Sequence, residues 1–234
     1  MNPRASAAAN GSDDVIAAHG LRFAYPGDGF RLRVETLRIP VGAHAACIGP
    51  SGCGKTTLIN LLTGIVAPDA GRIELCGQAI TDLSEDARRA LRIRRVGLVF
   101  QEFELLDYLT AYENILLPYY VAADMPADGA ARERARSIAT AMGVASTLRR
   151  RPGRLSQGER QRIAVCRALV TQPDLIVCDE PTGNLDPAST ARTLDLLFEQ
   201  AAAHDATLLV VTHNHALLDR FDRVIDMSAP EGAS

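Results

Sequence analysis

Residues 49–57 read Gly49-Pro50-Ser51-Gly52-Cys53-Gly54-Lys55-Thr56-Thr57. The first eight match G-x-x-x-x-G-K-[ST] and stand between an apolar strand expected at 43–48 and a helix expected at 54–62, the context that gives this motif its meaning. Glycines let the backbone turn tightly, so that its N–H groups and the positive end of the helix surround a phosphate. Lys55 adds a full charge for the outer phosphates, and the Thr56 hydroxyl is placed to coordinate Mg²⁺. The stretch, called the phosphate loop below, therefore predicts a nucleotide site.

The basic residues support this interpretation of Lys55. The chain has 25 basic residues, and Lys55 is the single lysine among them. Arginine is thus used wherever a positive charge suffices, and a compact ammonium is kept for the phosphate loop.

A second apolar run ends in two carboxylates, Asp179 and Glu180, followed by Pro181. Ligands of open parallel sheets lie beyond the carboxyl ends of the strands. We expect Asp179 to hold Mg²⁺, directly or through water, and Glu180 to orient and deprotonate the attacking water. Many strands of α/β proteins end in an acid, so the pair gains its meaning from the phosphate loop.

Composition excludes several classes of protein. Of the 234 residues, 47% are hydrophobic and 23% are charged, which is typical of a globular domain and excludes a disordered or fibrous chain. The net charge of −3 leaves no basic excess for holding nucleic acid. The longest nearly unbroken apolar run, 115–123, contains Pro118 and is far shorter than the roughly 20 residues of a membrane span.

The cysteines and histidines show no metal-binding pattern. Five cysteines are present, none in C-x-x-C spacing, and most lie in apolar runs typical of core thiols in a reducing compartment. Cys53 differs because it lies in the phosphate loop beside Lys55. We expect maleimide to inactivate the protein through Cys53 and MgATP to protect it.

The order of predicted elements indicates an α/β fold. After a flexible lead at 1–13, two strands at 15–25 and 30–39 flank a turn, and strand–helix alternation then runs through one domain, 14–234. Such alternation predicts a mainly parallel sheet covered on both faces. A helical stretch at about 101–160 is inserted between the two halves of this core.

The run Leu155-Ser156-Gln157-Gly158-Glu159-Arg160-Gln161-Arg162 resembles the signature loop of ABC ATPases. Other elements of that family match in order. Gln101 looks like the Q-loop glutamine, residues 184–186 look like the D-loop, His213 looks like the switch histidine, and Tyr25 looks like the aromatic residue that stacks on adenine. Several positions depart from the family. Gln157 stands where a glycine is usual, although Gly158 is kept, Asp107 replaces a frequent proline, and Asn214 replaces a frequent aspartate.

The resemblance implies a P-loop NTPase with a RecA-like core, a small antiparallel β part and a helical subdomain. It implies that two copies pair head to tail around two ATP molecules. Ser156, Gly158 and Glu159 would face the ATP held by the other copy. Gln101 would contact Mg²⁺ and the lytic water, and His213 would bond the γ-phosphate.

The wording of these motifs is most similar to the subgroup of the MacB, LolD and cell-division FtsE ATPases. That subgroup implies a separate transmembrane permease as partner and a peripheral position on the cytoplasmic face of the membrane. Two functions stay open, a motor for lipoprotein, peptide or drug movement and an FtsE-like regulator that moves no substrate. A soluble ABC ATPase acting on DNA or ribosomes is disfavoured, because there is one phosphate loop and no long insertion.

Overall fold

The structure is a computed structural model that describes residues 13–27, 29–181 and 187–228. Residues 1–12 of the expected lead and the D-loop at 184–186 therefore lie outside the described residues.

A parallel sheet runs through the middle of the molecule. Its strands are β6 (Val96–Val99), β7 (Leu175–Asp179), β8 (Thr207–Val211), β3 (His44–Ile48) and β9 (Arg223–Asp226), in that spatial order. Every neighbouring pair in it is parallel. The predicted parallel sheet is confirmed, and the strand expected at 43–48 is β3, which begins one residue later.

A second sheet is antiparallel and packs above the first. It contains β2 (Arg31–Pro40), β1 (Asp14–Ala24), β4 (Ala70–Leu75) and the short β5 (Gln78–Ala79), in the order β2-β1-β4-β5. Along β2, exposed and buried residues alternate from Arg31 to Glu35 and again from Thr36 to Ile39, as a strand with one solvated face requires.

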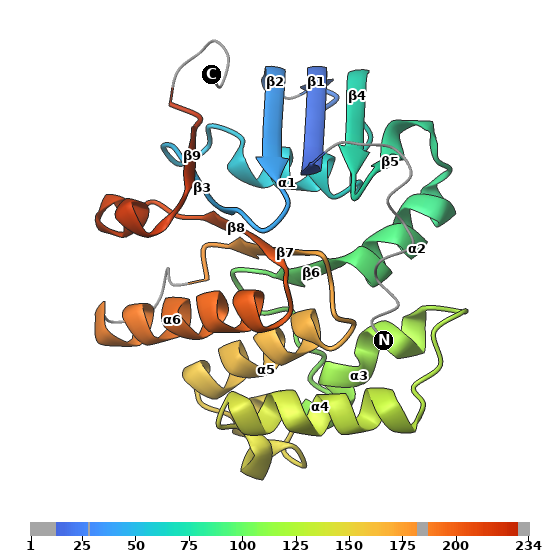
Figure 1. The fold of residues 1–234 in the computed structure, drawn as a ribbon, viewed down its shortest axis with the longest axis vertical. Helices are drawn as coiled ribbons and strands as arrows, with labels where there is room; N and C mark the ends of the chain where they lie inside the picture. Colours follow the sequence, from blue (N-terminus) through green and yellow to red (C-terminus); the bar gives the residue numbers. More distant parts are fainter. Residues whose placement is uncertain (1–12, 28, 182–186, 229–234) are drawn as a thin grey trace.

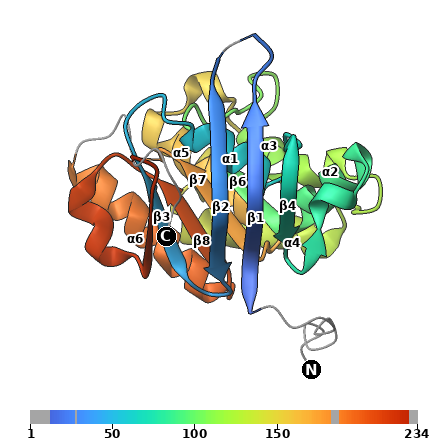
Figure 2. The same cartoon turned by 90° about the horizontal axis from the view of Figure 1, so that it is seen from above.

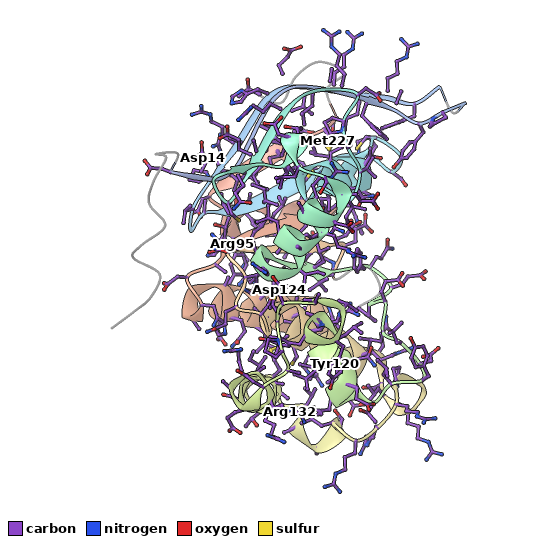
Figure 3. All side chains as sticks on the ribbon, turned by 90° about the vertical axis from the view of Figure 1, so that its right-hand side faces the viewer. Asp14, Arg95, Tyr120, Asp124, Arg132 and Met227 are labelled. Atoms are coloured by element: carbon purple, nitrogen blue, oxygen red, sulfur yellow. The ribbon has the colours of Figure 1, made fainter. Side chains whose placement is uncertain are left out.

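Helices complete the layers (Figure 1). α1 (Lys55–Leu62) lies between the two sheets. On the other side of the parallel sheet are α5 (Gln157–Leu169) and α6 (Pro187–Ala203), with α3 (Ala111–Val121) and α4 (Gly129–Ala141) beyond α5. The view from above shows the antiparallel strands lying over this stack (Figure 2). In Figure 3, Tyr120 and Arg132 mark the helical part, away from Asp14 and Met227 in the sheet part.

The central strands divide their side chains between two hydrophobic cores. On β7, Leu175 and Val177 belong to the core shared with α1 and the antiparallel sheet, whereas Ile176 and Cys178 belong to the core shared with the helices. β8 divides its residues in the same way. This two-residue period explains why these strands are apolar throughout, since both of their faces are buried.

The sequence patterns did not predict α2 (Glu85–Arg95). This helix buries none of its residues fully, and most of them are charged, so it offers few apolar residues from which a helix could be predicted. Its signals are polar instead. The Ser84 hydroxyl accepts from the backbone N–H of Ala87 at 3.3 Å, acids occupy the first turn, and arginines occupy the last.

Short 3₁₀ helices occur at Ile80–Asp82, Ala145–Thr147, Pro152–Arg154 and His215–Arg220. Within the described residues, no helix combines the length and the hydropathy that crossing a bilayer demands.

Candidate nucleotide site

A polar cavity of about 410 Å³ lies at the carboxyl ends of the parallel strands. It is lined by the phosphate-loop residues and their helix (Ser51, Gly52, Gly54, Lys55, Thr56, Thr57) and by Tyr25, Phe30, Gln101, Asp179 and Glu180. Strands far apart in the sequence thus deliver their loops to one place, where open α/β sheets bind ligands.

The phosphate loop has the backbone that its glycines predict. Gly54 caps α1 at φ +103°, a conformation that side chains disfavour, and a Cβ there would meet Phe30 Cζ at 2.6 Å. The Lys55 ammonium is largely buried and donates to the carbonyl oxygens of Gly49 and Pro50, both at 2.9 Å. The ammonium therefore lies within the loop itself, against the two residues that open it.

The Thr56 hydroxyl donates to Asp179 Oδ2 at 3.0 Å, so the two residues expected to hold Mg²⁺ lie side by side. Burial raises the pKa of the Asp179 carboxyl, and the neighbouring Glu180 carboxylate raises it further. The Thr56 hydrogen bond and the Lys55 charge act in the opposite direction. A cation bound at this carboxylate would favour its charged form.

Glu180 follows β7 in a left-handed backbone conformation, with φ +47°. Its N–H donates to the Val211 carbonyl at 3.1 Å, which ties it to the end of β8. His213 Nδ1 lies 3.7 Å from Glu180 Oε2. The predicted base and the predicted switch histidine are therefore neighbours, although His213 itself does not line the cavity.

Two aromatic rings form one wall of the cavity. Tyr25 packs edge-on against Phe23 at 4.8 Å between ring centroids and lies 6.1 Å from Phe30. The sequence patterns predicted Tyr25 and missed Phe30, which stands at the other end of the turn after β1. The signal available was an aromatic residue on each side of a glycine-rich hairpin.

The residues of the signature loop lie outside the lining of this cavity. Ser156 is the N-cap of α5, and its hydroxyl accepts from the Glu159 N–H at 3.2 Å while the Glu159 carboxylate accepts from the Ser156 N–H at 2.7 Å. This reciprocal pair is a capping box. Neither these two residues nor Gly158 line the cavity of their own chain.

Gln161, one helical turn further along α5, is a residue whose position the sequence did not predict. It is 1% exposed, and its Nε2 donates to the carbonyl of Pro181, next to Glu180. Its Oε1 accepts from the Thr193 hydroxyl of α6 at 3.4 Å. The signature helix is thus bonded directly to the turn that carries the predicted base.

Comparison with known proteins agrees with this geometry. The family described as "ABC transporter" matches residues 32–183. The lipoprotein-releasing system ATP-binding protein LolD of Ruegeria pomeroyi is 40% identical over 221 residues, covering 93% of this chain and 96% of that protein. The macrolide export ATP-binding/permease protein MacB of Syntrophobacter fumaroxidans is 39% identical, covering 83% of this chain but 27% of that longer protein.

Among solved structures, a dimeric ATP-binding cassette in a post-hydrolysis state bound to ADP and Pi has a TM-score of 0.80. It is 27% identical, and the match covers 91% of this chain and 94% of that one. The cavity, the strand order and these relatives point the same way. The chain belongs to the ABC transporter family, as one of its ATPase subunits.

Proposed function

We propose that this chain binds and hydrolyses MgATP at the cavity below Tyr25, in a head-to-tail pair of copies, and thereby drives a separate permease. One observation carries the proposal. The phosphate loop with Thr56, Gln101, and the adjacent Asp179 and Glu180 line a single cavity, although they come from three separate parts of the sequence.

The donor set of the cavity fits Mg²⁺. This cation prefers hydroxyl, carboxylate and amide oxygens, which Thr56, Asp179 and Gln101 supply from one cavity. When bound, Mg²⁺ neutralises phosphate charge and polarises the transferred phosphoryl group.

Each protein group then has a task that its place supports. Lys55 and the N–H groups of the phosphate loop bind and orient the outer phosphates. Glu180 takes the proton of the attacking water. His213, whose Nδ1 lies 3.7 Å from Glu180 Oε2, bonds the γ-phosphate. Tyr25 and Phe30 offer apolar faces for the adenine.

The second copy completes the site. The N-terminus of α5, with Ser156 and Gly158, presents the Ser156 hydroxyl and the positive end of the helix dipole, which suit an anion. Because this end does not line the cavity of its own chain, it serves the γ-phosphate held by the partner copy.

The permease is a separate chain that holds this subunit at the cytoplasmic face of the membrane. The name of MacB, an ATP-binding/permease protein, supports a permease partner, and the name of LolD, an ATP-binding protein, supports a separate ATPase chain. The two names point to macrolide export and lipoprotein release respectively. The LolD match spans nearly all of both chains, so lipoprotein release is the substrate class that we propose first.

The base is tested with Glu180→Gln. ATP binding, measured by calorimetry, stays at the wild-type level, whereas phosphate release falls about 10²- to 10⁴-fold, the usual contribution of one general base. Unchanged phosphate release would remove Glu180 from this role.

The shared site is tested by mixing two inactive variants, Lys55→Ala and Ser156→Arg. In a head-to-tail mixed dimer, one of the two sites combines an intact Lys55 with an intact Ser156, so activity returns on mixing. If both residues act within one chain, every chain in the mixture carries a lesion and activity stays absent.

A further inference from the structure

The turn that carries Gln101 has a backbone that ordinary residues disfavour. Phe103 and Glu104, just after Gln101, have φ values of +65° and +46°. Two successive non-glycine residues in the left-handed region each cost about 1–3 kcal/mol. Such a turn persists only where its surroundings hold it in place.

Arg167, near the end of α5, holds this turn. Its Nη1 donates to the Glu104 carbonyl at 2.5 Å, and its Nη2 donates to the Phe103 carbonyl at 2.6 Å. The side chain is only 9% exposed. The planar fork of a guanidinium holds its two donors in a fixed, parallel geometry, whereas the ammonium of a lysine is a compact charge on a flexible stem.

A buried guanidinium is costly to desolvate, and burial lowers the pKa of Arg167. The two oxygens that accept from Arg167 are backbone carbonyls of a turn that is itself disfavoured. Neither the burial of the cation nor the conformation of the turn is therefore favourable by itself. A buried cation bonded to a disfavoured turn just after Gln101 is best explained by what it positions.

The far end of the same loop has its own anchor. Asn114 of α3 is fully buried, and its amide donates to the carbonyls of Leu106, at 3.1 Å, and Thr110, at 3.0 Å. Its Oδ1 accepts from the Leu106 N–H at 2.8 Å. Asn114 therefore anchors the part of the loop from Leu106 to Thr110, and Arg167 anchors the part that carries Gln101.

α5 also contacts the strand that leads into this turn. The ideal Cβ position of Gly97 on β6 lies 2.3 Å from the Ala168 carbonyl oxygen, so only glycine permits this approach. Since Ala168 adjoins Arg167, one part of α5 locates both β6 and the turn after it. The same helix begins at Ser156, the end proposed to meet the partner's ATP.

We propose that Arg167 is a positioning residue for ATP hydrolysis, which holds the turn at 103–104 so that Gln101 stays at the cavity. The inference rests on the proposed function. Arg167 does not line the nucleotide cavity, so its effect passes through Gln101. Because α5 also begins at Ser156, the proposed contact with the partner's ATP and the chain's own Gln101 are linked through one helix.

The test uses Arg167→Met and Arg167→Lys, with Arg134→Met as the matched control. Arg134 also bonds backbone and side chain in the helical part, through Tyr119 Oη at 2.8 Å and the Val170 carbonyl at 3.4 Å, but it does not contact the Gln101 turn. Both Arg167 variants are expected to lower kcat about 10- to 100-fold, the usual effect of misplacing a catalytic group. The ATP affinity and the Arg134→Met kcat are expected to stay unchanged.

Two further readouts separate positioning from general destabilisation. In a Gln101→Ala background, Arg167→Met is expected to lower kcat no further, because the residue through which it acts is gone. Hydrogen exchange of the nucleotide-free protein should quicken at the amides of 100–105 and stay unchanged at 111–121, and this readout needs no activity.

Three results would overturn the inference: additive losses in the double variant, unchanged exchange at 100–105, or a loss of kcat that Arg134→Met shares. Failure of the proposed function gives a different pattern, since Glu180→Gln would then hydrolyse ATP as the wild type does.

Discussion

Gly97→Ala tests the contact between β6 and α5 most directly. The added Cβ would lie 2.3 Å from the Ala168 carbonyl oxygen and 2.9 Å from its carbon. Ordinary contacts between carbon and oxygen begin near 3.3 Å, so β6 and α5 must separate by about 1 Å. The oxygen belongs to the backbone of a helix, and no side-chain rotation can relieve the overlap.

Overpacking of this kind costs about 1–3 kcal/mol. For a chain of this size each kcal/mol lowers the melting temperature by about 2–4 °C, so a fall of about 2–12 °C is expected in a thermal unfolding experiment followed by circular dichroism. The kcat should fall as well, because the displaced segment of α5 includes Arg167.

Gly129→Ala is the matched control. Gly129 opens α4, has open space around its Cβ position and has no positive φ, so alanine should leave the melting temperature unchanged or raise it slightly. Adding Ala168→Gly to Gly97→Ala should not restore stability, because the clash is with the backbone. A melting temperature of Gly97→Ala equal to that of Gly129→Ala would refute the reasoning.

Three further outcomes are expected. Maleimide should label Cys53 first in the folded protein and MgATP should slow the labelling, because burial raises the pKa values of Cys47 and Cys166 to about 12; equal labelling with and without nucleotide would contradict this. Gly54→Ala should weaken ATP binding in calorimetry, since its Cβ would meet Phe30 at 2.6 Å; wild-type affinity would contradict it. The Ser156 N–H lowers the pKa of Glu159, so the stability lost in Glu159→Ala should be complete above the ordinary glutamate pKa of about 4.3 and should shrink as the pH falls from there through the lowered pKa of the folded state. Denaturation at pH 7 and pH 3 measures this difference, and an equal loss at both values would count against the capping box.

The sequence was sufficient for the features that depend on local patterns. The parallel strands were predictable because an unbroken apolar run is required where both faces of a strand are buried, as Leu175 to Cys178 are. The phosphate loop and the acids after β7 were predictable because their chemistry requires particular residues at fixed spacing. The capping box at Ser156 lies where the signature motif places the start of a helix.

The features that the sequence did not predict depend on contacts between distant segments. Arg167 and the carbonyl of Phe103 are 64 positions apart, so no local pattern reports their bond. Gln161 likewise gains its significance from Pro181, 20 positions away. α2 was missed for a different reason, since its signals are caps and charges rather than an apolar stripe.

In the proposed dimer, the Ser156 hydroxyl at the N-terminus of α5 both caps the helix and binds the partner's ATP, two roles that different residues usually fill. A serine oxygen can accept one bond and still donate its own proton, so the atom that accepts from the Glu159 N–H keeps a donor for an incoming phosphate oxygen. Aspartate or asparagine would cap the helix as well, but aspartate would repel the anion and asparagine would reach it with a bulkier amide. In the proposed pair of copies, only a small alcohol can cap the helix and donate to the partner's nucleotide with the same oxygen atom. Few side chains are therefore acceptable at position 156.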